Sequence, residues 1–182
     1  MKRRVLVVAV ALLLCVAMGA FAAEKKSSSI PWLVNYNAPG QSAIDLTAGW
    51  TEFGLGVEGA YNLTMGQFDI GPIPLSWGIT GAADVGFTYD LGLGAGGFAT
   101  LNWGLDFGGI WRFDFRVGLG LGIGFDFAPS WYGSPFGLGI GDYFSSTWLF
   151  AEKMGLTLQE IYVYSFFGPG FYAYTLGVEF KL

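Results

Sequence analysis

The sequence predicts an all-β fold, an eight-stranded antiparallel up-and-down transmembrane β-barrel. Residues 111–127 carry apolar side chains at every odd position and glycine or charged side chains at every even position, which is the period-two pattern of a β-strand. This segment exceeds the roughly 9 to 11 residues with which a tilted strand crosses a bilayer. Only 13% of the residues are charged and 18% are aromatic, so there is too little polarity to coat an ordinary water-facing surface.

The N-terminus predicts export. Three cations at positions 2–4 precede an apolar run over 5–18, and an Ala-Phe-Ala sequence at 20–22 supplies a small-x-small cleavage pattern. We interpret residues 1–22 as a secretory signal peptide, because the apolar run falls short of the roughly 20 residues of a spanning helix. Cys15 lies inside this segment, so the mature chain would contain no thiol in an oxidising compartment.

The mature chain is predicted to consist of a leader segment over 23–41 and a barrel over 42–182. The leader starts polar and contains Pro31 and Pro39. Without the signal cations, six Lys and Arg remain against fourteen Asp and Glu, a net charge of about −8. That balance argues against nucleic acid as a partner, because nucleic-acid binding needs clustered cations.

Eight runs of alternating residues are the expected strands, and the intervening segments are the expected connections. The strands are 44–50, 53–63, 75–89, 98–107, 111–127, 136–140, 146–158 and 171–182, and the connections include 64–74, 90–97, 128–135, 142–145 and 159–170.

Two details of this assignment stay open. A two-residue turn at Thr51-Glu52, with Trp50 opposite Phe53, explains a change of parity in the first hairpin, although a bulge would also do so. For 146–158, either Trp148 and Phe150 or Leu149 and Ala151 point outward.

The hairpin around Gly108-Gly109-Ile110 has a predictable register. Both flanking strands carry apolar residues at odd positions, so a three-residue loop that pairs Phe107 with Trp111 keeps those residues on one face. Asp106 then lies opposite Arg112, Gly104 opposite Asp114 and Asn102 opposite Arg116. We expect the side chains of Asp106 and Arg112 to be in contact, because buried charges must be matched.

The orientation of the two faces decides the class of barrel. In a soluble lipocalin-like ligand-binding barrel the apolar row would point inward, and water would meet a nearly bare row of glycines at 118–124. In a membrane barrel the aromatic rows face lipid, while small and paired charged residues fill the lumen. The charged residues expected in the lumen are Glu58, Asp84, Asp106, Asp114, Glu179, Arg112, Arg116 and Lys181.

The last eight residues carry a family resemblance. The polar Thr175, Gly177 and the hydrophobic Phe180 and Leu182 resemble the C-terminal assembly signal of bacterial outer-membrane proteins, although a terminal Leu replaces the usual aromatic residue. With its signal peptide and eight strands, the chain resembles the small OmpA-like, OmpX-like and OmpW-like barrels. The resemblance implies a place in the bacterial outer membrane, with membrane lipid and the barrel assembly machinery as partners.

The absence of one residue type limits the chemistry. The chain contains no histidine, and the outer-membrane proteases, phospholipases and lipid A modifying barrels resemble one another in using one. General acid–base catalysis near neutral pH and soft metal sites also lose their commonest residue. We therefore expect no enzymatic activity, no metal and no cofactor, and we interpret the lumen carboxylates as barrel-filling charges.

Two functions are compatible with these observations. The first is an envelope anchor or interaction protein that contacts an extracellular ligand or protein through outer loops 128–135, with Trp131 and Tyr132, and 159–170. The second is a narrow conduit for small, mostly apolar molecules, which the OmpW-like resemblance implies. A glycine-lined lumen would leave such a conduit more room than an eight-stranded barrel usually has.

Overall fold

The computed structural model describes residues 30–88, 91–127 and 134–182. The predicted signal peptide, residues 23–29 of the leader, and Trp131 and Tyr132 lie outside the described residues. Within the described ranges, no helix has the length and apolarity needed to cross a membrane.

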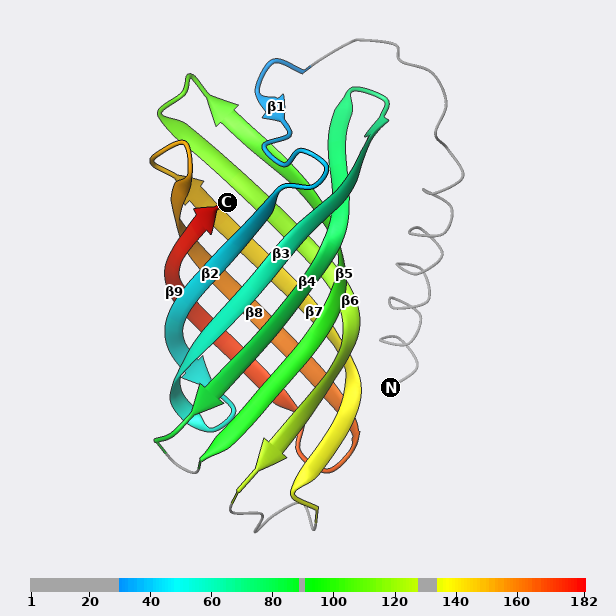
Figure 1. The fold of residues 1–182 in the computed structure, drawn as a ribbon, viewed down its shortest axis with the longest axis vertical. Coiled ribbons are helices and arrows are strands. Elements are labelled where there is room, and N and C mark those ends of the chain that lie inside the picture. The colour runs from blue at the N-terminus through cyan, green and yellow to red at the C-terminus, as the bar shows by residue number, and fades with distance from the viewer. Residues whose placement is uncertain (1–29, 89–90, 128–133) are drawn as a thin grey trace.

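Eight tilted antiparallel strands close into a barrel (Figure 1). Each strand pairs with the next along the chain, and the ring closes where β9 pairs with β2. These strands are β2 (Ser42–Thr51), β3 (Gly54–Ile70), β4 (Ile73–Gly86), β5 (Gly92–Phe107), β6 (Trp111–Asp126), β7 (Phe136–Leu149), β8 (Met154–Phe167) and β9 (Phe171–Lys181). The predicted eight-stranded up-and-down barrel is confirmed, and closure gives each of the eight described ring strands a partner on both sides.

The alternating segment that predicted the fold is β6. Its hairpin with β5 has the predicted register, with Phe107 opposite Trp111 and Asp106 opposite Arg112. Gly108 and Gly109 in the connecting loop have φ values of 74° and 79°, a left-handed conformation that glycine adopts without strain. The chemistry of this turn therefore fixed the pairing of the two strands.

Several predicted connections are strands, so their boundaries were wrong. Strand β3 continues through 64–70, because a bulge between Thr64 and Gly66 moves the alternation by one residue. The glycines at 92–97 are paired in β5, because the ladder is made by backbone groups and needs no side chain. The expected turn at 142–145 lies inside β7.

The predicted connection at 159–170 is mostly strand β8. The sequence pattern is hidden there because polar side chains point outward and apolar ones point inward. Glu160 and Tyr162 lie on the outer face, whereas Ile161 and Val163 are buried. The single strand expected over 146–158 is wrong, because β7 ends at Leu149 and β8 begins at Met154; within β7, Trp148 lies on the outer face and Leu149 is buried.

The first hairpin turns one residue later than expected. Thr51 pairs with Gly54, so Trp50 lies opposite Leu55 and the turn consists of Glu52 and Phe53. Phe53 was expected on the outer face, but it is only 4% exposed. At a turn position its side chain is freed from the alternation of the strand, and it closes one end of the lumen.

The two faces of the barrel have opposite polarity. Leu46 is 58% exposed on the outside, while its neighbour Asp45 is fully buried inside. The same contrast recurs around the ring, with exposed aromatic and aliphatic side chains outside and polar side chains within. The soluble lipocalin-like interpretation is therefore wrong, because that barrel would bury its apolar row.

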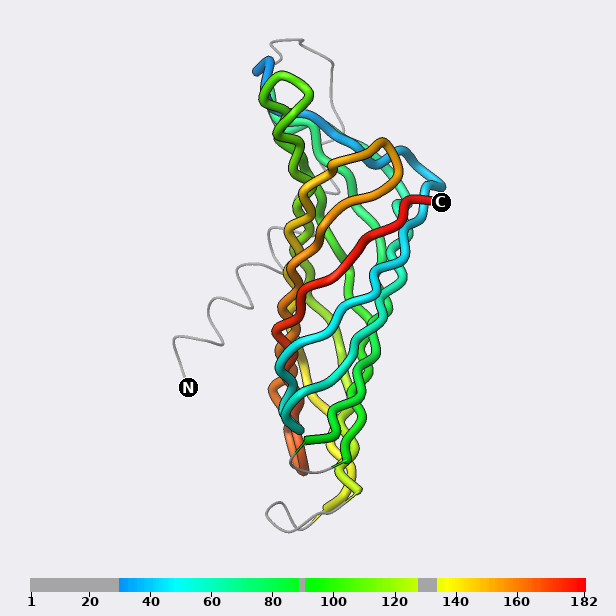
Figure 2. Tube along the Cα trace, turned by 90° about the vertical axis from the view of Figure 1, so that its left-hand side faces the viewer, coloured from blue at the N-terminus to red at the C-terminus, as the bar shows by residue number. Residues whose placement is uncertain are grey.

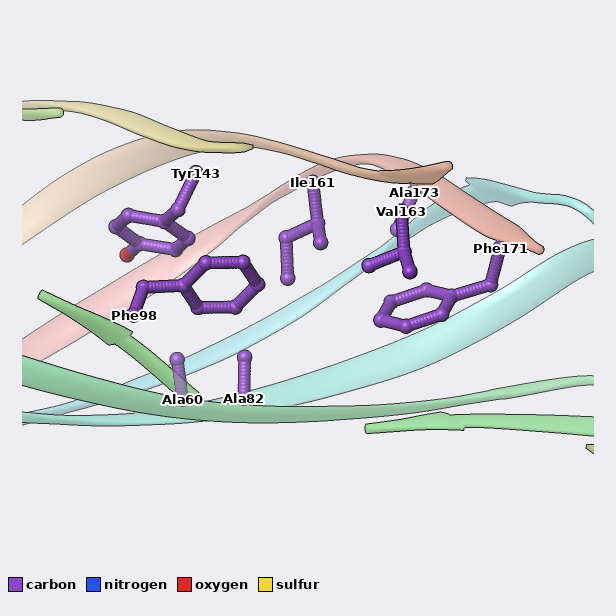
Figure 3. Packing of buried hydrophobic residues seen from close by; sticks show 8 residues of the cluster. All are labelled: Ala60, Ala82, Phe98, Tyr143, Ile161, Val163, Phe171 and Ala173. Carbon is purple, nitrogen blue, oxygen red and sulfur yellow. The ribbon is translucent and has the colours of Figure 1, made fainter. Parts of the chain in front are cut away.

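Apolar side chains fill the half of the lumen that lies away from the C-terminus of β9, and Figure 3 shows how they pack. This cluster consists of Ala60, Ala82, Phe98, Tyr143, Ile161, Val163, Phe171 and Ala173. The rings of Phe98 on β5 and Tyr143 on β7, the two strands that flank β6, stack with their centroids 5.6 Å apart.

The described part of the leader crosses the other end of the barrel, where the C-terminus of β9 also lies (Figure 2). Its short strand β1 (Leu33–Val34) pairs with β5, so that Leu33 lies opposite Leu105. Trp32 stacks on Phe107 with a centroid separation of 6.1 Å. These contacts hold the leader against the rim and direct its next residues into the lumen.

Candidate functional site

The polar half of the lumen begins at Asp114. Its carboxylate accepts hydrogen bonds from Asn37 of the leader at 2.9 and 3.1 Å, and it lies 2.9 Å from the ammonium of Lys181. Lys181 also donates to the Asn37 amide oxygen and lies over the ring of Tyr36, 5.5 Å from its centroid. The leader therefore supplies two of the groups that surround this cation.

Burial and the nearby Asp106 carboxylate raise the pKa of the Tyr36 phenol above its usual value. The Tyr36 hydroxyl donates to the carbonyl of Leu105. Tyr36 therefore remains a neutral cap at the mouth of the lumen.

Arg116 links the next layer of the lumen. Its guanidinium forms an ion pair with Glu179, a second with Asp114 at 3.2 Å, and a third with Asp45 at 4.0 Å. Each of these side chains is at most 2% exposed. Such a cation offsets the cost of burying the carboxylates around it.

Amide and hydroxyl groups bind further polar atoms at this depth, whereas one oxygen each of Asp45 and Glu179 has no hydrogen-bond partner among the described residues. Asp45 accepts from Asn62 at 2.7 Å and from Gln159, and Gln159 also donates to Tyr143 at 3.1 Å. Thr80 donates to Asn62 at 2.6 Å. The resulting network joins β2, β3, β4, β7 and β8 across the lumen.

Two carboxylates lie where the polar half meets the apolar half. Glu58 and Asp84 are opposite one another on β3 and β4. Glu58 accepts from Thr175 at 2.9 Å, whereas neither oxygen of the buried Asp84 has a hydrogen-bond partner among the described residues. Neither carboxylate takes part in the ion pairs of the described lumen.

The predicted charge cluster is thus divided. Asp114, Arg116, Glu179 and Lys181 are joined by ion pairs. Asp106 and Arg112 lie opposite one another as predicted, but they form none of the ion pairs of the described chain. The Asp106 carboxylate instead accepts from the backbone of Gly109 at 2.6 Å, because the tight turn brings that amide within reach.

Sequence reasoning missed several members of the network. Asp45 could have been found, because it alternates with the outward Ile44 and Leu46. Gln159 was hidden by the wrong assignment of β8 as a connection. Asn37 gives no signal in the sequence, because only the path of the leader brings it to Asp114.

The lumen glycines leave less room than the sequence suggested. A side chain at Gly94 would collide with the carboxylate of Asp84 and the ring of Phe171, and one at Gly92 would collide with Phe53. These two glycines therefore make space for larger side chains from other parts of the barrel. The expectation of a wide, glycine-lined lumen is corrected accordingly.

The chemical repertoire of this site is narrow. Within the described ranges, no group of three or more His, Cys, Asp or Glu side chains could hold a metal ion. The ion pairs of the lumen join charged side chains of β2, β6 and β9 to one another.

Comparison with known proteins supports the fold. No family model and no curated protein matches the sequence. Among solved structures, the chain is similar to the outer membrane enzyme PagL, with a TM-score of 0.52 and 12% identity over 77% of this chain and 99% of that chain. The chain therefore has the β-barrel fold of a small outer-membrane protein.

Two further structures are similar over comparable lengths. Ail, the attachment invasion locus protein of Yersinia pestis, has a TM-score of 0.43 and 13% identity over 80% of this chain and 100% of that chain. Neisserial surface protein A has a TM-score of 0.44 and 12% identity over 78% of this chain and 94% of that chain.

Proposed function

We propose that this protein is a sealed, non-enzymatic β-barrel of the bacterial outer membrane that acts as an envelope anchor or interaction protein. The observation that supports it best is the filling of the lumen. The ion pairs around Arg116 occupy one half, and the rings of Phe98 and Phe171 occupy the other.

The absence of histidine from the sequence also supports a non-enzymatic role. PagL is an enzyme, so the shared fold by itself is compatible with catalysis. In this lumen, however, the carboxylates of Asp114 and Glu179 are held by cations, which suits a structural role better than proton transfer.

Interaction with partners is proposed for the end of the barrel that lies opposite the C-terminus of β9. The predicted contact segment 159–170 is not available there as a loop, because β8 takes it up as far as Phe167. The connection between β6 and β7 is the longest at that end, and it includes Trp131 and Tyr132. The proposal therefore assigns the contact to this connection.

Reconstitution into planar bilayers and liposomes tests the seal. We expect no conductance above that of the protein-free bilayer and no swelling in small sugars or amino acids. As a matched arm, Phe98→Ala with Phe171→Ala removes two rings from the apolar half and should raise leakage. Conductance or solute uptake by the unaltered protein would contradict the proposal and favour the narrow conduit.

A further inference from the structure

The outer surface of β7, β8 and β9 carries polar side chains where the rest of the barrel is apolar. We call this surface the tyrosine face, and it consists of Asp142, Glu160, Tyr162, Tyr164, Tyr172 and Tyr174. Asp142 lies midway along β7 and Glu160 lies midway along β8. Each has buried, inward-pointing neighbours on both sides, so strand alternation places the two carboxylates on the outside.

The members of the tyrosine face form one continuous patch. Asp142 lies opposite Tyr162, and Glu160 lies opposite Tyr174. The ring of Tyr162 is 4.3 Å from that of Tyr164 and 6.3 Å from that of Tyr172, between centroids. Tyr164 and Tyr174 are nearly half exposed.

The two carboxylates of this patch lie midway along their strands, where a spanning strand crosses hydrocarbon, whereas Tyr164 and Tyr172 lie nearer the strand ends. Towards the end that bears the C-terminus, the outer face of β8 continues with Leu156 and Leu158, and towards the other end the outer face of β7 continues with Ile140 and Leu138. Interfacial tyrosines belong at the ends of spanning strands, next to the lipid headgroups. Asp142 and Glu160, at the middle of their strands, are out of reach of those headgroups.

No basic side chain of the described chain reaches the patch. Arg116 and Lys181 form ion pairs inside the lumen. Arg112 is the second residue of β6, next to the β5–β6 loop, and Lys153 is in the connection between β7 and β8. Among the charged residues of the described strands, Asp142 and Glu160 are the ones that lie on the outer face at mid-strand. Unpaired carboxylates are costly in hydrocarbon, and polar groups at such depth commonly mark functional contacts.

We propose that the tyrosine face is a lateral docking surface for a membrane-embedded segment of another protein that places a Lys or Arg side chain at mid-depth. The two carboxylates supply the opposite charge. The exposed rings of Tyr164 and Tyr174 supply apolar contact, hydroxyl donors and cation–π partners. This surface is separate from the connection proposed above to contact partners in water.

A second copy of the chain fits the patch less well. A two-fold axis along the membrane normal brings equivalent residues together at equal depth. The acidic patch of one copy would then meet the same patch of the other, and such like-charge contacts are costly.

A defined peptide tests the proposal in liposomes that contain the full mature barrel. The probe is a Leu/Ala helix long enough to span the bilayer, carrying Lys at its centre, and its controls carry Leu or Glu there. Energy transfer between a label on the barrel and a label on the peptide reports association. We expect the Lys peptide to bind about tenfold more tightly than either control, a difference of about 1.4 kcal/mol.

Isosteric variants identify the surface. Asp142→Asn with Glu160→Gln should abolish the preference for Lys, whereas Asp106→Asn, which removes a carboxylate at the mouth, should keep it. Heat-modifiable gel mobility checks that each variant is folded. Equal binding of the three peptides to the unaltered barrel, preference retained by the double variant, or self-association of the barrel through this face would overturn the proposal.

Discussion

Arg116 is the residue on which the polar half of the lumen depends. It contacts carboxylates from β2, β6 and β9, and the side chains involved are almost fully buried. A buried pair of this kind adds little net stability compared with a well-packed apolar pair, but the loss of one partner leaves a charge without compensation. We therefore expect the stability of the polar half of the lumen to be sensitive to substitution of Arg116.

Replacing Arg116 by Met should lower the free energy of unfolding by about 3–5 kcal/mol, because Glu179 and Asp114 lose their shared cation. Urea unfolding in detergent micelles, followed by tryptophan fluorescence, measures the change. Lys153→Met at the exposed connection is the control and should change stability by less than about 0.5 kcal/mol. Equal effects of the two substitutions would show that the ion pairs do not hold the lumen.

At the scale of elements, the leader behaves as a ninth piece of the barrel. Strand β1 adds to the edge of the β5–β6 hairpin where that hairpin extends past the rim, and Asn37 enters the mouth of the lumen. Gln67 of β3 donates to the Asn37 carbonyl at 2.8 Å, so the inserted residue is held from both sides. The leader is thus fastened by specific polar contacts as well as by ring stacking.

Asn37→Asp should release the leader from the mouth, because a second carboxylate would then face Asp114 across a hydrogen-bond distance. The expected result is faster chymotrypsin cleavage at Trp32 and Tyr36, while the barrel itself stays resistant. Asn37→Ser keeps the site neutral and should be cleaved more slowly than Asn37→Asp. If both variants are cleaved at the same rate as the unaltered chain, the contacts of Asn37 are not what holds the leader.

For the whole molecule, assembly depends on how the chain presents its last strand. Phe180 and Leu182 point outward, whereas Thr175 is buried against Thr47 and Glu58. A side chain at Gly177 would collide with the backbone of β2. The resemblance to an assembly signal therefore stays a prediction for all four residues, and only the outward two can be tested without disturbing the lumen.

Leu182→Phe supplies the aromatic terminus usual in that signal and should raise the fraction of chain that assembles in the bacterial outer membrane. Membrane fractionation combined with heat-modifiable gel mobility measures this fraction. Leu182→Ser should lower it. Equal assembled fractions with Phe, Leu or Ser at this position would contradict a role for residue 182 in the assembly signal.

The sequence by itself determined the number of strands, the barrel class, the polarity of most faces and the β5–β6 register, because these follow from local alternation and from the glycine turn at 108–109. Only the tertiary structure decided the course of 159–170, the filling of the lumen and the place of the leader. In β8, polar Glu160 lies outside and apolar Ile161 lies inside, which reverses the apolar-outside, polar-inside alternation of most other strands. Phe53, Phe171 and Asn37 fill spaces opened by glycines and strands far away in the chain, and no local pattern records such long-range packing.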